Sequence, residues 1–444
     1  MSGDLLLSYY GDDFTGSTDS MEVLSLGGVP AVLFLKPPTR ALLAAFPEAR
    51  AVGFAGTSRS ESPDWMDREL PGIFAGLRAL GAPICHYKTC STFDSAPGVG
   101  SIGRAIDIGQ ATFGGRFVPL VIGAPALKRY TAFGNLFAGS EGAIYRIDRH
   151  PVMRDHPVTP MDEGDMTRHL ARQTARRIGL LDLISLRGPA PAAALDAVVA
   201  GGAEIVLLDV LEEADLARAG ELIWARRGTE AAFVAGSSGV EYALMAHWRA
   251  AGALPAPAPI TEAGPVARLA AVSGSCSPVT EKQLRHAMSH GFEGIAVDAR
   301  ALAEPGSAEA AREAAIASGR AALQAGRSVV VYSALGRDGG FVETRGAEAI
   351  GFNRNLGEQL GAILRVLVTQ EKLTRALVAG GDTSSHAARQ LGLSALTLAT
   401  PIAPGSPLCR GHAPGGALDG LEIALKGGQV VGAAYFRQVL EGTA

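Results

Sequence analysis

Two adjacent carboxylates near the N-terminus are the residues with the clearest capacity for chemistry. Asp12 and Asp13 follow an apolar run, Leu5–Tyr10, that predicts a buried strand, and they precede a helical pattern over residues 20–26. Open α/β sheets bind ligands beyond the carboxyl ends of their strands. The pair therefore predicts a site for a polar substrate or a metal ion, and the alternative is that one aspartate only caps the helix. The spacing does not choose between a metal ligand and a general base.

A second loop with reactive groups follows another predicted strand, Ile84–Lys88. Lys88 could hold an anionic group, and Ser91, Thr92 and Asp94 could bond hydroxyls. A lysine, a carboxylate and hydroxyls in one loop at a strand end suit a pocket for a sugar acid. The alternative is a solvated loop that contains a helix cap.

Two single residues add to these loops. Arg59 follows the predicted strand Ala51–Phe54, and an arginine there can bind a carboxylate through two parallel hydrogen bonds. His156 lies in a proline-stiffened turn. Each has a plain alternative, since a lone arginine is often a surface residue and a lone histidine is often structural.

Glycine- and serine-rich turns in the second half predict a nucleotide site. Two of them lie between a predicted strand and a helix, where backbone N–H groups can bind phosphate. Neither matches the P-loop pattern or the dinucleotide fingerprint, which disfavours a P-loop NTPase and an ordinary Rossmann dehydrogenase. The candidate residues are Ser273, Gly274, Ser275, Gly380, Gly381, Asp382 and Thr383, with further turns at Gly405 and at Lys426, Gly427 and Gly428.

The elements that must position these residues predict two α/β domains, each with a largely parallel sheet flanked by helices. We expect domains at 1–250 and 266–444, joined by a linker rich in proline and alanine at 251–265. Besides the three strands above, the expected strands are 31–35, 119–123, 205–208, 231–235, 269–273, 294–297, 328–333, 376–379 and 395–398.

The composition excludes several classes of function. The chain has 444 residues, of which 47% are hydrophobic and 19% charged, as in a globular protein. A net charge of −4 and 6% aromatic residues argue against nucleic acid as a partner, and no apolar run is long enough to span a membrane. Four scattered cysteines and an N-terminus without a basic segment predict a cytoplasmic protein.

Five segments together resemble the four-carbon acid sugar kinase family. They cover nearly the whole chain in the order that the family has them: Asp12–Gly16, Lys88–Ser95, His156–Pro160, Ser273–Ser277 and Gly380–Ser384. The resemblance implies an ATP-dependent kinase that phosphorylates a terminal hydroxyl of a sugar acid such as threonate or erythronate. It implies that the first domain binds the sugar acid, the second binds ATP, and both ligands lie in the cleft between the domains.

The chain departs from the usual family pattern at Tyr10 and Gly11, directly before the acid pair. A branch of the family that acts on the branched acid 3-oxo-isoapionate is similar at this point. We therefore expect Tyr10 and Gly11 to mark which sugar acid is chosen.

On this hypothesis Asp12 or Asp13 orients or deprotonates the attacking hydroxyl, while Arg59 and Lys88 neutralise the substrate carboxylate. Mg²⁺ is expected to arrive with ATP rather than in a metal site of the protein. The expected partner is a small sugar acid, and a homodimer is one option for the oligomeric state. A non-catalytic sensor of sugar acids and ATP, and a sugar-acid dehydrogenase, are the alternative functions.

Overall fold

The computed structural model divides into two compact units, which are described here one at a time. Unit 1 comprises residues 1–32 and 37–258, and unit 2 comprises 33–36 and 259–444. The structure describes residues 5–140, 142–156, 158–228, 231–254, 261–336, 339, 342, 346–427 and 432–444. Of residues 346–350 and 382–384 it describes only the backbone. The predicted linker lies partly outside these residues, and the predicted domain boundaries stay a prediction.

Unit 1 is built on a parallel sheet with the strand order β3-β1-β4-β11-β5-β10-β9. Its central strands are buried along their whole length, which explains why they read as apolar runs in the sequence. The strands are β1 (Leu7–Gly11), β3 (Ala51–Ala55), β4 (Ile84–Lys88), β5 (Val118–Val121), β9 (Ile178–Leu181), β10 (Ile205–Leu208) and β11 (Ala232–Gly236).

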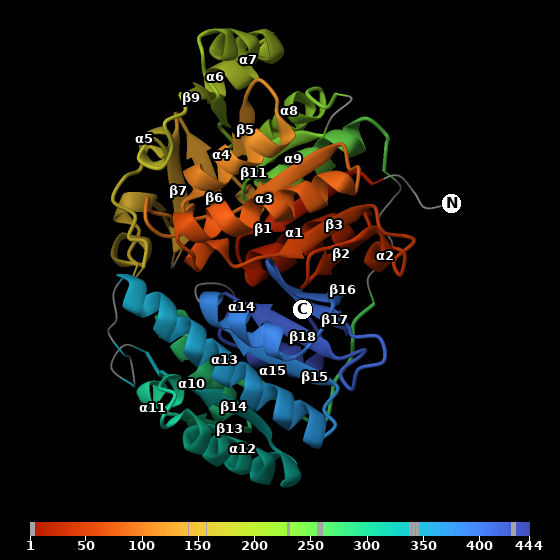
Figure 1. Ribbon diagram of the computed structural model, residues 1–444, viewed down its shortest axis with the longest axis vertical. Helices are drawn as coiled ribbons and strands as arrows, with labels where there is room; N and C mark the ends of the chain where they lie inside the picture. The colour runs from red at the N-terminus through yellow and green to blue at the C-terminus, as the bar shows by residue number, and fades with distance from the viewer. Residues whose placement is uncertain are drawn as a thin grey trace. The chain divides into compact units, whose positions relative to one another are not determined.

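Helices cover both faces of this sheet (Figure 1). On one face α3 and α4 bury apolar side chains against alternate residues of the strands, among them Tyr10, Tyr87 and Phe233. On the other face Tyr9 turns toward α1 and donates a hydrogen bond to Ser17 O at 3.1 Å. The helices of unit 1 are α1 (Phe14–Leu26), α2 (Arg40–Leu43), α3 (Pro63–Ala79), α4 (Ile102–Phe113), α5 (Met166–Leu170), α6 (Leu183–Arg187), α7 (Pro191–Ala200), α8 (Glu213–Trp224) and α9 (Gly239–Ala250).

A small antiparallel sheet follows β5 and was not predicted. It has the order β6-β7-β8, with β6 (Arg129–Ala132), β7 (Asn135–Ser140) and β8 (Ala143–Arg146). Its residues are mostly half-buried, and polar and apolar residues are mixed, so they lack the apolar run that marks the strands of the large sheet. Short 3₁₀ turns flank it at Pro125–Leu127, Ile147–Arg149 and Met153–Asp155, and another, Ser58–Ser60, follows β3.

Unit 2 has a mixed sheet with the order β13-β14-β12-β15-β18-β17-β16. The first five strands are parallel, whereas β17 runs antiparallel to both β18 and β16. The end of β2 (Ala31–Phe34) belongs to this unit, because Leu33 and Phe34 pair with Leu396 and Ala395 of β16. The strands are β12 (Ala270–Ser273), β13 (Phe292–Ala296), β14 (Ser328–Tyr332), β15 (Arg375–Ala379), β16 (Ala395–Ala403), β17 (Ser406–His412) and β18 (Glu422–Lys426).

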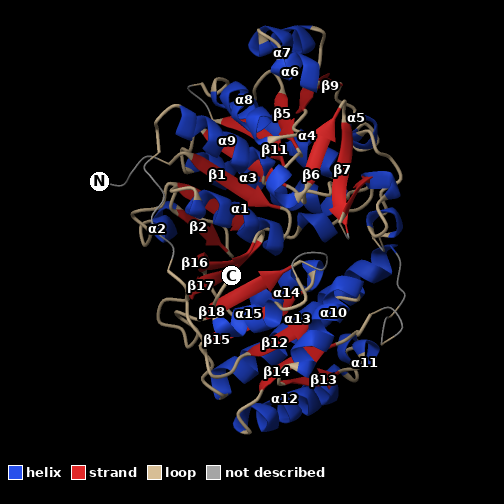
Figure 2. Ribbon diagram, turned by 180° about the vertical axis from the view of Figure 1, so that it is seen from behind, coloured by secondary structure: helices blue, strands red, loops and turns tan. Residues whose placement is uncertain are grey.

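Helices also flank the sheet of unit 2 (Figure 2). They are α10 (Pro278–Ser289), α11 (Ala299–Ala303), α12 (Ala308–Gln324), α13 (Gly346–Gln370), α14 (Gly381–Gln390) and α15 (Tyr435–Glu441). In the part of the chain that the structure describes, no helix is both long and apolar enough to cross a lipid bilayer.

The expected class, two α/β domains with largely parallel sheets, is confirmed. Every predicted strand has a counterpart, displaced by a few residues at most except at β16, which runs five residues beyond its predicted end. The predictions missed β6 to β9, β17 and β18. Ile178–Leu181 contains a glycine, Ser406–His412 mixes polar and apolar residues, and Glu422–Lys426 has only three apolar residues between two charged ones, so their patterns are weak.

Arg375 ties several elements of unit 2 together. Its side chain is 1% exposed, and it donates to Glu422 Oε2 at 2.6 and 2.9 Å and to the carbonyls of Gly264, Val439 and Leu440. We expect Arg375→Met to destabilise the protein by about 3–5 kcal/mol, because it leaves a carboxylate and three carbonyls without their donor. Thermal unfolding followed by circular dichroism measures the effect.

Arg410 provides a matched control for this change. It approaches the other oxygen of Glu422 at 3.8 Å but is 54% exposed. Arg410→Met should cost less than about 1 kcal/mol, as exposed ion pairs do. Equal losses in the two variants would contradict the importance assigned to Arg375.

Candidate functional site

The carboxyl ends of three neighbouring strands bring the predicted residues of unit 1 together. Gly11, the last residue of β1, lies in register with Ala55 of β3 and with Lys88 of β4. The backbone continues this alignment beyond the strands, where Asp12 N donates to Lys88 O at 2.9 Å and Arg59 N donates to Asp12 O at 3.1 Å. Asp12, Arg59 and Lys88 are therefore neighbours even though 76 residues separate the first from the last.

Asp13 has a structural role, in which both of its carboxylate oxygens accept hydrogen bonds. It is the N-cap of α1, where its Oδ1 accepts a hydrogen bond from Gly16 N at 2.7 Å. Its Oδ2 accepts from Thr15 Oγ1 at 2.8 Å and from Arg59 Nη1 at 3.1 Å. Asp13 is therefore the aspartate that caps the helix, and the helix begins earlier than the pattern over residues 20–26 predicted.

Asp12 differs from its neighbour in having a free oxygen. It is 3% exposed, and its Oδ1 is buried without a hydrogen-bond partner among the described residues. Burial, followed by the charge of Asp13, raises the pKa of Asp12 from 3.8 to about 7, against the lowering effect of Arg59 and Lys88. A carboxyl group with these properties can exchange a proton near neutral pH.

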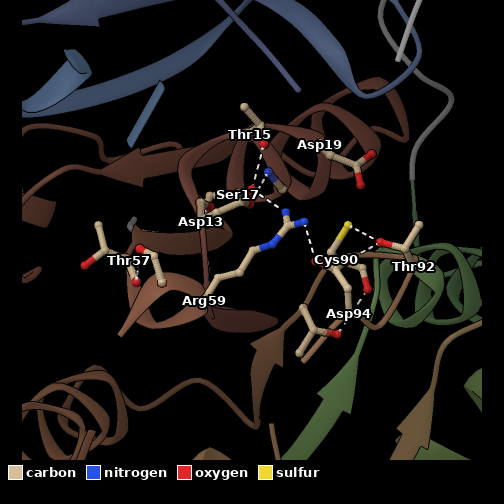
Figure 3. Close-up of polar contacts among 12 residues, drawn as sticks. Asp13, Thr15, Ser17, Asp19, Thr57, Arg59, Cys90, Thr92 and Asp94 are labelled. Carbon is tan, nitrogen blue, oxygen red and sulfur yellow. Dashed lines mark hydrogen bonds and ion pairs between the residues drawn. The ribbon is translucent and has the colours of Figure 1, made fainter. Parts of the chain in front are cut away.

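Arg59 lies between two carboxylates (Figure 3). Its Nη1 donates to Asp13, and its Nη2 donates to Asp94 Oδ2 at 2.7 Å. Asp94 is buried, which by itself favours the neutral form. The charges of Arg59 and His156 and the hydrogen bonds from Thr92 and Arg59 outweigh burial and lower the pKa of Asp94. Asp94 is therefore a fixed anion that orients Arg59.

The loop after β4 is held in place by a buried aromatic residue. Phe93 is fully buried in the core beneath α4, with φ +56°. This anchor directs Thr92 and Asp94 toward Arg59, and Thr92 Oγ1 donates to Asp94 Oδ1 and also contacts Cys90 Sγ. Ser91 is half-buried in the same loop.

Lys88 is almost fully buried and is already partly neutralised. Its Nζ lies 3.8 Å from Asp19 Oδ2 and donates to Thr89 O at 2.9 Å. Gly16 allows this approach, since a Cβ there would lie 2.8 Å from the lysine Nζ and 2.6 Å from Asp13 Oδ1.

His156 lies near this group through Thr159. Its Nδ1 accepts a hydrogen bond from Thr159 N at 3.2 Å, and Thr159 Oγ1 donates to Asp94 Oδ2 at 3.3 Å. The structure thus brings the segment after the 3₁₀ turn Met153–Asp155 to the loop after β4.

Tyr10 and Gly11 do not lie as expected for residues that select a substrate. Tyr10 is fully buried in the core, where its ring contacts Phe54, Phe74 and Tyr87. Gly11 is required by packing, because a Cβ there would lie 1.9 Å from Ser17 Oγ. The side chain of Tyr10 therefore packs in the core with α3, and the expectation that Tyr10 and Gly11 mark the chosen sugar acid stays a prediction.

In unit 2 the predicted phosphate loops also meet at one edge of the sheet. Ser273 of β12 is in register with Ala379 of β15, which is in register with Lys426 of β18. Gly274 N donates to Ala379 O and Gly380 N donates to Lys426 O, at 3.3 and 2.8 Å. The loops lead into the N-termini of α10 and α14, and Ser273 Oγ is buried without a partner among the described residues.

The other residues predicted to bind the nucleotide lie at the same edge of the sheet or are not among the described residues. Lys426 is fully buried, donates to Thr280 Oγ1 at 3.1 Å and to Gly427 O at 2.6 Å, and has its pKa lowered to about 7 by burial. Gly405, with φ +75°, forms the turn between β16 and β17. Ser275 Oγ accepts from Ser277 N. The side chains of Asp382 and Thr383 and all of Gly428 lie outside the described residues.

The sequence analysis missed polar residues that line the edge of unit 1. Ser237 and Ser238 follow β11, whose last residue, Gly236, is in register with Lys88. The Gly236–Gly239 turn repeats the strand–Gly/Ser–helix pattern of the second half, and that pattern could have revealed it. Asp19 was missed because the predicted helical pattern begins only at residue 20, whereas α1 already includes Asp19 and brings its Oδ2 to 3.8 Å from Lys88 Nζ.

Unit 1 has charged and hydroxyl groups at its strand ends, and unit 2 has Gly/Ser loops at its strand ends. This combination defines a class of protein that binds a small polar molecule and a nucleotide. Residues 7–244 match the pattern of a sugar-binding N-terminal domain, and residues 270–436 match that of a nucleotide-binding C-terminal domain. The chain belongs to the four-carbon acid sugar kinase family, as the resemblance implied.

Curated relatives cover almost the full chain. A 3-oxo-isoapionate kinase from Paraburkholderia graminis is 52% identical over 99% of this chain and 94% of its own length. A 3-oxo-tetronate kinase from Methylobacterium radiotolerans is 32% identical, with 98% and 99% covered, and one from Cupriavidus necator is 30% identical, with 98% and 96% covered.

Solved structures share the fold. One from Salmonella typhimurium, provisionally described as a tRNA synthase, has a TM-score of 0.73 at 25% identity, with 98% of both chains covered. A Haemophilus influenzae protein has a TM-score of 0.67 at 23% identity, with 97% of this chain and 98% of its own covered. The second likeness concerns the fold alone.

The raised pKa of Asp12 predicts how its replacement changes stability with pH. Between pH 3.8 and about 7 the folded protein keeps a proton that the unfolded chain releases, so the contribution of this group to stability is present below pH 3.8 and is lost as pH rises through about 7. Asp12→Asn carries no charge at any pH, and we expect it to be more stable than the wild type at pH 8 by about 1–4 kcal/mol. At pH 4 the difference should be close to zero.

Tryptophan fluorescence during urea unfolding measures this effect, because Trp65, Trp224 and Trp248 are the tryptophans of the chain and all lie in unit 1. Asp13→Ala is the matched control and should be less stable than the wild type at pH 8, since it loses the cap of α1 and the ion pair with Arg59. A lower stability of Asp12→Asn at pH 8 would contradict the prediction.

Proposed function

We propose that this protein, an ATP-dependent sugar-acid kinase, phosphorylates a hydroxyl of the branched acid 3-oxo-isoapionate, with Asp12 as the catalytic base. The identity of 52% to a kinase of that name supports this substrate over 3-oxo-tetronate, whose kinases are 27–32% identical. Its compartment, the cytoplasm, and a homodimeric state are proposals that rest on the sequence alone.

The single observation that carries the role of Asp12 is its unpartnered buried oxygen. Asp13 and Asp94 both accept hydrogen bonds from Arg59, and Asp13 also caps a helix, whereas Asp12 Oδ1 has no such partner among the described residues. A substrate hydroxyl can therefore donate to Asp12 without displacing an existing bond. A pKa near 7 lets the Asp12 carboxylate take up the proton of the substrate hydroxyl. The hydroxyl oxygen then bonds to the γ-phosphorus of ATP as the bond from that phosphorus to ADP breaks.

The remaining groups of unit 1 would orient the substrate. Thr92 and Ser91 present hydroxyls, and Arg59 keeps N–H groups beyond those bonded to Asp13 and Asp94. Fixed groups of this kind favour phosphoryl transfer mainly by positioning, so a strong base is not required.

The edge of unit 2 fits the phosphates of ATP. Ser273 Oγ has no partner among the described residues, Gly274 and Gly380 precede helix N-termini, and Lys426 supplies a buried amino group. These residues would hold the phosphates, and ATP with its Mg²⁺ would supply the phosphoryl group and neutralise the charge on it.

The substrate assignment predicts the order of activities in an ADP-release assay. With 3-oxo-isoapionate, 3-oxo-tetronate, threonate and erythronate compared at equal concentration, 3-oxo-isoapionate should give the highest kcat/KM. Tight binding of one acid without ADP release would indicate a sensor instead, and reduction of a nicotinamide cofactor would indicate a dehydrogenase.

The two aspartates should separate in their kinetics. Asp12→Asn should lower kcat by about 10²–10⁴-fold, since the hydroxyl loses its proton acceptor. Asp13→Asn should lower kcat by about tenfold or less, because asparagine still caps α1 and only the Oδ2 acceptor of Arg59 and Thr15 is lost. The wild-type rate should rise with pH through about 7, as Asp12 ionises.

Comparable losses in the two variants, or near-normal turnover of Asp12→Asn, would overturn the assignment of the base. The unfolding measurements above serve as the control that both variants are folded.

A further inference from the structure

Arg129 reaches the same edge of unit 1 from the small sheet. It is the first residue of β6, and its backbone exchanges hydrogen bonds with Ala124, at 2.9 and 3.2 Å. Ala124 follows the end of β5, whose Val121 is in register with Gly236 of β11. Since Gly236 is also in register with Lys88, Arg129 is fixed beyond the strand ends that carry the site.

The guanidinium of Arg129 is held by its own turn and not by an acid. Its Nη1 donates to the carbonyls of Leu127 and Lys128 at 3.0 and 3.2 Å. Its Nε is buried and has no hydrogen-bond partner within the described ranges, where the residue also forms no ion pair. A buried N–H without an acceptor costs free energy, which a bound anion would recover.

Charges of the substrate loop reach this guanidinium. Burial lowers the pKa of Arg129, and Cys90 and Asp94 act in the opposite direction when they are ionised. Burial raises the pKa of the Cys90 thiol, whereas Asp94 keeps a lowered pKa, so Asp94 is the charge of this loop that acts on the guanidinium near neutral pH. The residue as a whole is half-buried, so part of its side chain reaches solvent although Nε itself is buried.

The other cations of the site are already balanced by acids. Arg59 bonds two carboxylates and Lys88 lies against a third, so these two cations face four acids once Asp12 is ionised, an excess of two negative charges. The charge of His156, which also acts on Asp94, offsets only part of that excess. An anionic substrate would be repelled by that set alone. Arg129 supplies a further positive charge that no acid of the described residues neutralises.

We propose that Arg129 binds the carboxylate of the sugar acid and so makes this site select acids over uncharged sugars. Because Nη1 is used by the two carbonyls, Nε–H and Nη2–H remain as the parallel pair of donors that binds a carboxylate side-on. This role rests on the proposed function. It makes Arg129, rather than Arg59 and Lys88, the principal ligand of the substrate carboxylate.

The test compares Arg129→Gln and Arg129→Lys with the wild type, using 3-oxo-isoapionate and its primary amide. Arg129→Gln should raise KM for the acid by about 10–100-fold, with a small change in kcat and none in KM for ATP. Its affinity for the amide, measured by calorimetry without ATP, should stay near that of the wild type. Arg129→Lys should restore part of the affinity for the acid.

Lys128→Gln is the matched control, because it removes an exposed positive charge from the adjacent position. It should leave KM for the acid unchanged, and tryptophan fluorescence should show that all variants unfold as the wild type does.

An unchanged KM for the acid in Arg129→Gln, an equal loss for acid and amide, or a rise confined to KM for ATP would each overturn the inference. A different observation would show that the proposed function is wrong: the wild type itself would release no ADP with any sugar acid.

Discussion

The parallel register of β1, β3 and β4 is the constraint on which the site of unit 1 depends. It aligns Gly11, Ala55 and Lys88, so the residues that follow these strands must share one edge. Backbone hydrogen bonds from Asp12 to Lys88 and from Arg59 to Asp12 extend the alignment into the loops. The chemistry is therefore positioned by the most buried part of the sheet rather than by the loops themselves.

Within this frame, burial and pairing give neighbouring acids opposite properties. Asp94 receives a guanidinium and two hydroxyls, and these partners keep it ionised despite burial. Asp12 is equally buried but lacks a partner at Oδ1 in the described structure, and its pKa rises to about 7. Identical side chains thus acquire pKa shifts in opposite directions, a difference that depends on environment alone.

In unit 2 the predicted phosphate-binding loops likewise lie at the carboxyl ends of its parallel strands. The ends of β12, β15 and β18 are in register, and the antiparallel hairpin of β16 and β17 brings Gly405 to that edge as well. Lys426 contributes an amino group whose burial lowers its pKa to about 7, so a nearby anion would stabilise its charged form. The match to a nucleotide-binding domain agrees with this arrangement.

The sequence by itself determined the class of fold, the strands of the two sheets with strong apolar runs, and the family. Continuous apolar runs predict buried parallel strands because both faces of such strands must be covered. The family motifs located Asp12, Lys88 and Asp94 because all three lie at strand ends: Asp12 follows β1, Lys88 is the last residue of β4, and Asp94 lies in the loop after β4. The half-polar strands β6 to β8 left no comparable signal, and with them Arg129 escaped notice.

Only the tertiary structure decided how these residues divide the work. The direction of side chains around a strand end determines which aspartate caps α1 and which keeps a free oxygen. It also determines whether Tyr10 faces the site or the core, because a displacement of one residue reverses the face of the sheet. The sequence listed the charges, whereas the register of strands distant in the chain determined which charge neutralises which. Pairing of this kind is long-range, and for that reason no local pattern encodes it.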